Sequence, residues 1–179
     1  MQIRRIVTAI DPAGKAVIQS DDLLQQAFQS RPGFALTSLW STEEVPKIGV
    51  GEVADPVPTL KNLHPPTGGT RLLVFTLPPD ASMLTPGFDP VAFGAEFAQK
   101  APGFIEAFEP DAPGMHTTDT VDYGVLLDGE IWLELDDQRE VKLGPCDVVI
   151  QNGTRHAWRN KSSREATLLF VLVGATRDA

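Results

Sequence analysis

The chain has 179 residues, 42% of them apolar and 22% charged, a balance typical of a globular protein with a hydrophobic core of its own. Its net charge of −9 argues against binding to nucleic acid or to an anionic membrane surface, because both require a basic face. The single cysteine, Cys146, excludes an intrachain disulfide and a cysteine-rich zinc site.

The N-terminal segment MQIRRIVTAIDPAG has neither the apolar core nor the small-residue cleavage site of a signal peptide. The longest apolar run, LLFVLVGA at 168–175, is much shorter than the roughly 20 residues of a membrane-spanning helix. We therefore expect a cytoplasmic protein without nucleic-acid or membrane partners.

Residues 1–113 combine short strands with irregular segments. The segment 43–69 contains too many prolines and glycines for a helix and predicts a long loop. Runs rich in β-branched and aromatic residues, bounded by turn formers, predict strands at 3–10, 15–19, 34–40 and 70–77.

One helix is predicted, over residues 89–100 (DPVAFGAEFAQK). Asp89 is a suitable N-cap and Pro90 suits the first helical position. Val91, Phe93 and Phe97 form the expected apolar stripe of this helix.

From residue 114 onward, short strands follow one another at close and even spacing, which predicts a β-sandwich or barrel. We expect one structural domain, in which 1–113 pack as strands, loop arm and short helix on a barrel core formed by 114–179. The expected strands lie within 121–129, 130–137, 140–145, 147–153, 155–160 and 166–174.

The stretch MHTTDTVDYGVLLDGE carries polar residues at alternate positions: His116, Thr118, Thr120 and Asp122. In an extended strand these four side chains leave the backbone on one face. Six residues separate Asp122 from Gly129, which with the preceding aspartate signals a turn.

These residues resemble the first motif of the cupin superfamily, with His116 at the first histidine, Asp122 at the carboxylate and Gly129 at the closing glycine. The segment GPCDVVIQNGTRHAWRN is similar to the second cupin motif through Gly153, His156 and Asn160. The two motifs together look like those of small single-domain bacterial cupins of type 2.

The resemblance implies an all-β fold, the cupin double-stranded β-helix or jelly-roll barrel, and a homodimer. It also implies a divalent metal ion (Fe, Mn, Ni or Zn) bound by His116, Asp122 and His156. Two imidazoles and one carboxylate with open positions suit such ions. The implied function is that of a metal-dependent dioxygenase, decarboxylase, isomerase or lyase acting on a small organic metabolite.

Thr118 stands where the second motif histidine belongs, so the metal motif is degenerate. The missing imidazole either leaves a coordination position open for substrate or marks a metal site that has been lost. The second alternative is a metal-free cupin that binds a small molecule without catalysis. We expect Thr118, Gln151 and Trp158 to contact substrate or the metal ligands.

The remaining candidates are weaker. We expect His64 to be solvent-exposed in its loop, and less readily a fourth ligand. The tight turn at Cys146 has no neighbouring base and gives no reason to expect a nucleophile. Parity places Tyr123 outside the barrel and Arg155 in a surface ion pair, whereas Asn160 suits a turn better than a metal.

Overall fold

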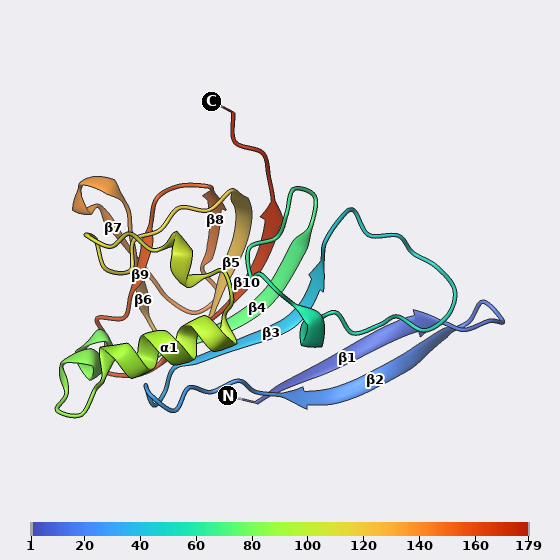
Figure 1. Cartoon of the computed structure of the whole chain (residues 1–179), viewed down its shortest axis with the longest axis horizontal. Helices are drawn as coiled ribbons and strands as arrows, with labels where there is room; N and C mark the ends of the chain where they lie inside the picture. Colours follow the sequence, from blue (N-terminus) through green and yellow to red (C-terminus); the bar gives the residue numbers. More distant parts are fainter. Residues whose placement is uncertain (1, 179) are drawn as a thin grey trace.

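The computed structural model describes residues 2–178 as antiparallel β-sheets with one α-helix (Figure 1). A five-stranded sheet has the order β3 (Ala35–Thr42), β4 (Thr70–Leu77), β10 (Ala166–Gly174), β5 (Thr120–Asp128) and β8 (Val148–Asn152). A three-stranded sheet has the order β7 (Glu140–Leu143), β6 (Ile131–Glu134) and β9 (Ala157–Arg159). The predicted all-β jelly-roll barrel is confirmed, and residues from both sides of position 113 share its larger sheet.

The core lies on the inner faces of these sheets. Strand β10 pairs with β4 on one side and β5 on the other, so its backbone hydrogen bonds are satisfied within the sheet. Alternate residues of β10, Leu168, Phe170 and Leu172, are at most 8% exposed and pack in the main apolar cluster. Alternation in this strand thus fixes which face lines the barrel.

Two motif glycines occupy turns that other residues would strain. Gly129 has φ +88°, and a Cβ there would lie 2.5 Å from the Glu165 carbonyl oxygen. Gly153 has φ +59°, and its Cβ would lie 3.1 Å from the Thr118 carbonyl oxygen. Positive φ and close backbone approach both favour glycine, so these positions shape the turns of the barrel.

Helix α1 (Pro90–Lys100) lies where the sequence predicts it, with the Asp89 side chain accepting hydrogen bonds from the amides of Val91 and Ala92. Phe97 is buried and Phe93 half-buried, but Val91 is 80% exposed, so its assignment to the apolar stripe was wrong. Residue 91 is in the first turn, pointing away from the barrel. Short 3-10 turns complete the chain: η1 (Val57–Thr59), η2 (Asp80–Leu84), η3 (Ile105–Ala107) and η4 (Asp136–Gln138).

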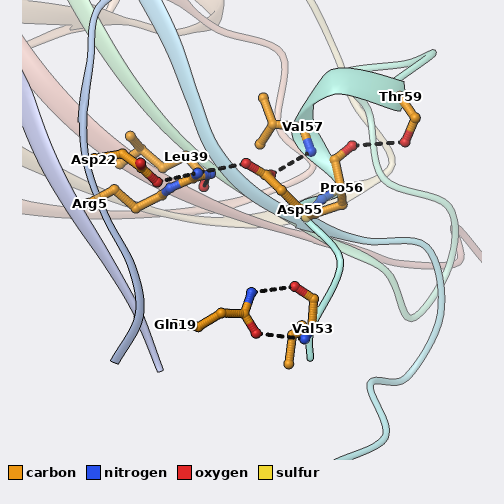
Figure 2. Close-up of polar contacts among 9 residues, drawn as sticks. All are labelled: Arg5, Gln19, Asp22, Leu39, Val53, Asp55, Pro56, Val57 and Thr59. Atoms are coloured by element: carbon orange, nitrogen blue, oxygen red, sulfur yellow. Dashed lines mark hydrogen bonds and ion pairs between the residues drawn. The ribbon is translucent and has the colours of Figure 1, made fainter. Parts of the chain in front are cut away.

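Strands β1 (Ile3–Ile10) and β2 (Ala16–Leu24) form a separate hairpin beside β3, and the loop 43–69 arches from β3 toward it (Figure 1). Figure 2 shows Arg5 joining three segments: it donates to the Leu39 carbonyl in β3 at 3.1 Å, to Asp22 at 3.1 Å and to Asp55 at 2.6 Å. These contacts fix the hairpin and the predicted loop to the larger sheet.

No helix within residues 2–178 is long and apolar enough to cross a membrane.

Candidate functional site: a paired-histidine cavity

A cavity of about 430 Å³ lies inside the barrel and is bordered by strands, by α1 and by the segment that follows it. That volume suits a small organic molecule. Seven of the nine phenylalanines of the chain line it, so its wall is mainly aromatic. Its polar lining includes Arg31, Asp80, Glu109, His116, Thr118, Asp122, His156 and Arg159.

His116 and His156 lie side by side in this cavity. Their backbones form an antiparallel bridge, with the His116 amide 2.9 Å from the His156 carbonyl oxygen and the His156 amide 3.0 Å from that of His116. Because directly opposed residues of an antiparallel pair point the same way, the imidazole centroids are only 4.2 Å apart. Both side chains are buried. The structure thus brings the histidines of the two motifs together.

Both imidazoles have a defined tautomer. Nδ1 of His116 is 3.0 Å from the Gly114 carbonyl oxygen, and Nδ1 of His156 is 2.8 Å from that of Thr154. A carbonyl oxygen only accepts, so each Nδ1 carries the proton and each Nε2 keeps a lone pair. Burial lowers the pKa of His116, while burial and the neighbouring His116 lower the pKa of His156 to about 4. At neutral pH the pair is therefore uncharged.

Asp122, on β5, lines the same cavity and is 7% exposed. Burial raises its pKa to about 6, although a hydrogen bond from Thr120 opposes the shift. Its Oδ1 has no hydrogen-bond partner among the described residues. Gln151 lies opposite Asp122 on the neighbouring strand β8. Its Nε2 is buried and also has no hydrogen-bond partner among residues 2–178, whereas its Oε1 accepts a hydrogen bond from the Thr154 hydroxyl at 2.5 Å. The barrel wall thus contains a carboxylate with unused acceptor capacity.

These donors match the chemistry of a divalent metal: two neutral imidazoles with free Nε2 atoms, oriented by backbone carbonyls, and a buried carboxylate with an unpartnered oxygen. Within residues 2–178, however, no three His, Cys, Asp or Glu side chains already form a metal-binding group. The Thr118 hydroxyl donates to or accepts from the Thr120 hydroxyl at 2.7 Å. The two imidazoles of His116 and His156 are already adjacent, whereas the Asp122 carboxylate does not complete a three-donor group with them.

Of the side chains predicted to contact substrate, Thr118 and Trp158 line the cavity, and Gln151 does not. Trp158 packs between His156 and Phe170, at ring-centroid distances of 6.0 and 5.4 Å. Gln151 lies directly opposite Asp122 on the neighbouring strand β8 and does not border the cavity. Trp132 does not border the cavity; its ring lies against the Lys142 ammonium, 5.2 Å from ring centroid to Nζ.

The prediction that His64 is solvent-exposed is wrong. The residue is half-buried instead of exposed, because its ring stacks on Phe104 at 5.2 Å with an interplanar angle of 12°. Both ring nitrogens are sealed from solvent without hydrogen-bond partners in the described part of the chain, and burial lowers the pKa. His64 borders a second, more polar hollow with Asn62 and Thr118.

Three other expectations agree with the structure. Arg155 pairs with Glu109 and Asp136 at 2.6 and 2.8 Å on the surface. Asn160 is buried in a turn, and Tyr123 is 47% exposed on the outer face of β5.

The segment from α1 to residue 113 was not recognised as part of the site, although it supplies much of the aromatic wall. Phe93, Phe97, Phe104 and Phe108 line the cavity, and Phe108 approaches His116 at 5.2 Å between ring centroids. The available signal was the density of phenylalanine, with four in the sixteen residues 93–108.

No protein-family model matches the chain. Among curated proteins, it is 54% identical over 62 residues to "Phomopsin biosynthesis cluster protein C'" of Diaporthe leptostromiformis, a match covering 34% of this chain and 33% of that protein. It is 42% identical over 66 residues to "Oryzines biosynthesis cluster protein J" of Aspergillus oryzae, covering 35% and 36% respectively. The match thus spans about a third of the length of each relative.

Among solved structures, the chain is similar to the Cnp3 cupin domain of Schizosaccharomyces pombe, with a TM-score of 0.47, 9% identity, and coverage of 97% of this chain and 89% of that one. It is also similar to the Cupin_2 domain of an XRE family transcriptional regulator from Enterobacter cloacae, with a TM-score of 0.41, 15% identity, and coverage of 80% and 99%. Neither likeness bears on the activity of this chain.

Proposed function

We propose that the barrel binds a small, largely apolar organic metabolite and acts on it as a metal-dependent enzyme. The observation that carries the proposal is the His116–His156 pair, neutral and with both Nε2 atoms available, inside an aromatic cavity of about 430 Å³. Perturbed titratable groups gathered in an apolar cavity are typical of catalytic and binding sites.

In this proposal His116 and His156 bind the metal through Nε2, and Asp122 supplies a third donor after a change in its side-chain position. A divalent ion held there would supply Lewis-acid stabilisation of negative charge on a substrate oxygen. The protein's own contribution is orientation and exclusion of water: the carbonyls of Gly114 and Thr154 fix the two rings, and the phenylalanines keep the cavity apolar. Dioxygenation, decarboxylation, isomerisation and elimination are all compatible with this arrangement.

The names of the two fungal relatives support a role with metabolites, since both refer to biosynthesis clusters. Because the match covers about a third of each relative, a shared reaction is not part of the proposal.

A metal-free binding protein is the second candidate. It is favoured by Thr118 at the position of the missing histidine, and by the lack of a preassembled three-donor group within residues 2–178. In that case the histidine pair would hydrogen-bond to the ligand, and Trp158 with the surrounding phenylalanines would provide most of the contact surface.

Metal content separates the two candidates. The protein is expressed in media supplemented in turn with Fe, Mn, Ni and Zn, and bound metal is measured by mass spectrometry after desalting. The metal-dependent enzyme predicts close to one equivalent of at least one metal in the wild type, and loss of that metal in His116→Ala and in His156→Ala, because each removes one of the two imidazole donors.

His64→Ala is the matched control, since it removes the third histidine of the chain without touching the pair. We expect it to retain its metal. Metal below a tenth of an equivalent in all four media would exclude the metal-dependent enzyme and leave the metal-free binding protein. Equal metal content in the wild type, His116→Ala and His156→Ala would show that the metal binds outside the histidine pair.

A further inference from the structure

Arg31, in the segment between β2 and β3, is a buried cation bordering the cavity. It is 6% exposed. Its guanidinium makes one hydrogen bond with the described residues, from Nε to Ser82 Oγ at 3.3 Å, and its Nη2 is sealed without a partner. The face of the guanidinium packs on Phe34 and Phe93, 5.5 and 5.6 Å from their centroids. A group with five N–H donors thus leaves most of them unused.

Arg71 shows how the same fold accommodates a buried arginine that is structural. It is 1% exposed, yet its Nε donates to the Asn62 carbonyl at 3.0 Å and its Nη1 to the carbonyls of Thr42 and Thr70 at 2.9 Å. Its Nη2 pairs with Glu43 at 2.9 Å. Every nitrogen of that guanidinium has an acceptor, so the open donors of Arg31 are not a general consequence of burial in this protein.

The charge of Arg31 is also incompletely balanced. Within residues 2–178 no carboxylate lies in ion-pair contact with it, although Asp80, which also borders the cavity, acts on it electrostatically. Burial lowers the pKa of Arg31 and raises that of Asp80, as expected for charges in an apolar setting. The other arginine of the cavity wall, Arg159, is paired with Glu134. A buried cation without a hydrogen-bonded anion is costly, and an incoming carboxylate would relieve that cost.

A row of aromatic rings connects this cation with the histidine pair. Phe93 contacts Arg31, Phe97 lies 5.7 Å from Phe93, and Phe108 lies 6.1 Å from Phe97. Phe108 in turn lies 5.2 Å from His116. All of these residues border the same cavity, so one elongated apolar molecule would contact the cation and the imidazoles together.

We propose that Arg31 binds the carboxylate of an apolar carboxylic acid whose body lies along the phenylalanine row and reaches the histidine pair. This inference rests on the proposed use of the cavity for a small molecule. It adds the class of ligand and the residue that selects it. The guanidinium fork suits a carboxylate because two parallel N–H groups are able to bond its two oxygens, and in this proposal the side chain turns so that the buried Nη2 faces the cavity together with Nη1.

The test compares acids with neutral analogues in metal-free protein, using calorimetry in the presence of a chelator. The probes are decanoate against decan-1-ol and cinnamate against cinnamyl alcohol, which separate aliphatic from aromatic bodies. We expect at least one acid to bind the wild type about tenfold or more tightly than its alcohol, as charge-assisted hydrogen bonds allow. Arg31→Met should remove that preference and leave binding of the alcohol unchanged or stronger.

Arg31→Lys should retain part of the preference for the acid, because it keeps the charge and loses the fork. Arg164→Gln, which removes an exposed arginine paired with Asp128, is the control and should bind as the wild type does. If the wild-type protein binds each acid and its alcohol equally tightly, the inference is wrong. It is also wrong if the folded Arg31→Met variant still prefers the acid. Failure of all four probes to bind would count against both the inference and the small-molecule function itself.

Discussion

The carboxylate of Glu96 stabilises the segment that carries Arg31. From α1 it accepts hydrogen bonds from the amides of Gln29 and Ser30 at 2.9 and 2.8 Å, from the Ser30 hydroxyl at 2.5 Å and from Lys100 Nζ at 2.6 Å. We predict that Glu96→Gln destabilises the protein, since a neutral amide oxygen accepts these bonds more weakly and its NH₂ group offers no acceptor.

The magnitude follows from the pKa of Glu96. Burial disfavours the charged form, but the bonds from Lys100, Ser30 and Gln29 outweigh it and lower the pKa from 4.5 to about 2. At about 1.4 kcal/mol for each pKa unit, this corresponds to roughly 3.5 kcal/mol. Exposure to solvent weakens these bonds, so we expect a loss of about 2 kcal/mol at pH 7.

The stabilisation by Glu96 decreases as the pH falls. A carboxylate with a lowered folded-state pKa stabilises the fold fully above its unfolded value near 4.5, and the contribution disappears as the pH falls toward about 2. Urea denaturation should therefore show a gap between wild type and Glu96→Gln at pH 7 that narrows steadily below pH 4.5. Glu130→Gln, at an exposed pair with Lys142, is the control and should change stability by less than about 0.5 kcal/mol. A gap that is absent at pH 7, or constant down to pH 2.5, would refute this reasoning.

Two further predictions concern the turn at Asn160 and the surface of the hairpin. Asn160→Ala should cost about 2–3 kcal/mol in urea denaturation, because the buried amide donates to the carbonyls of Leu77 and Arg164 at 2.8 Å; a loss below about 0.5 kcal/mol would contradict this. We also predict a homodimer, since Ile18 and Leu23 of the hairpin are 68% and 67% exposed. Light scattering should give twice the chain mass, and Ile18→Glu should lower it toward one chain mass, whereas Val91→Glu on α1 should not. A wild-type monomer at micromolar concentration would contradict the dimer.

The fold could be predicted from local signals because each has a direct physical cause. The apolar, β-branched run at 166–174 predicts a strand, and Asp89 followed by Pro90 predicts the start of α1. The pairing of His116 with His156 follows from two motifs that the resemblance places on one barrel.

The rest depends on tertiary contacts that no local pattern encodes. The proline-rich loop around His64 predicts exposure, but packing of that ring on Phe104 depends on where the segment after α1 lies. Arg31 has no signal at all in the sequence, because its missing hydrogen-bond partners become evident only when Ser82 and Phe93 surround it. Gln151 was expected to contact substrate or the metal ligands; it lies opposite Asp122 in the pairing of β5 with β8 but does not border the cavity.

The most direct test of the metal-dependent site is a crystal structure grown with Mn or Zn and measured at wavelengths that reveal anomalous scattering. The account predicts a single strong peak inside the barrel, within about 2.0–2.4 Å of Nε2 of both His116 and His156, with the Asp122 carboxylate turned toward it. A cavity without a peak at saturating metal, or a peak that contacts neither imidazole, would contradict it.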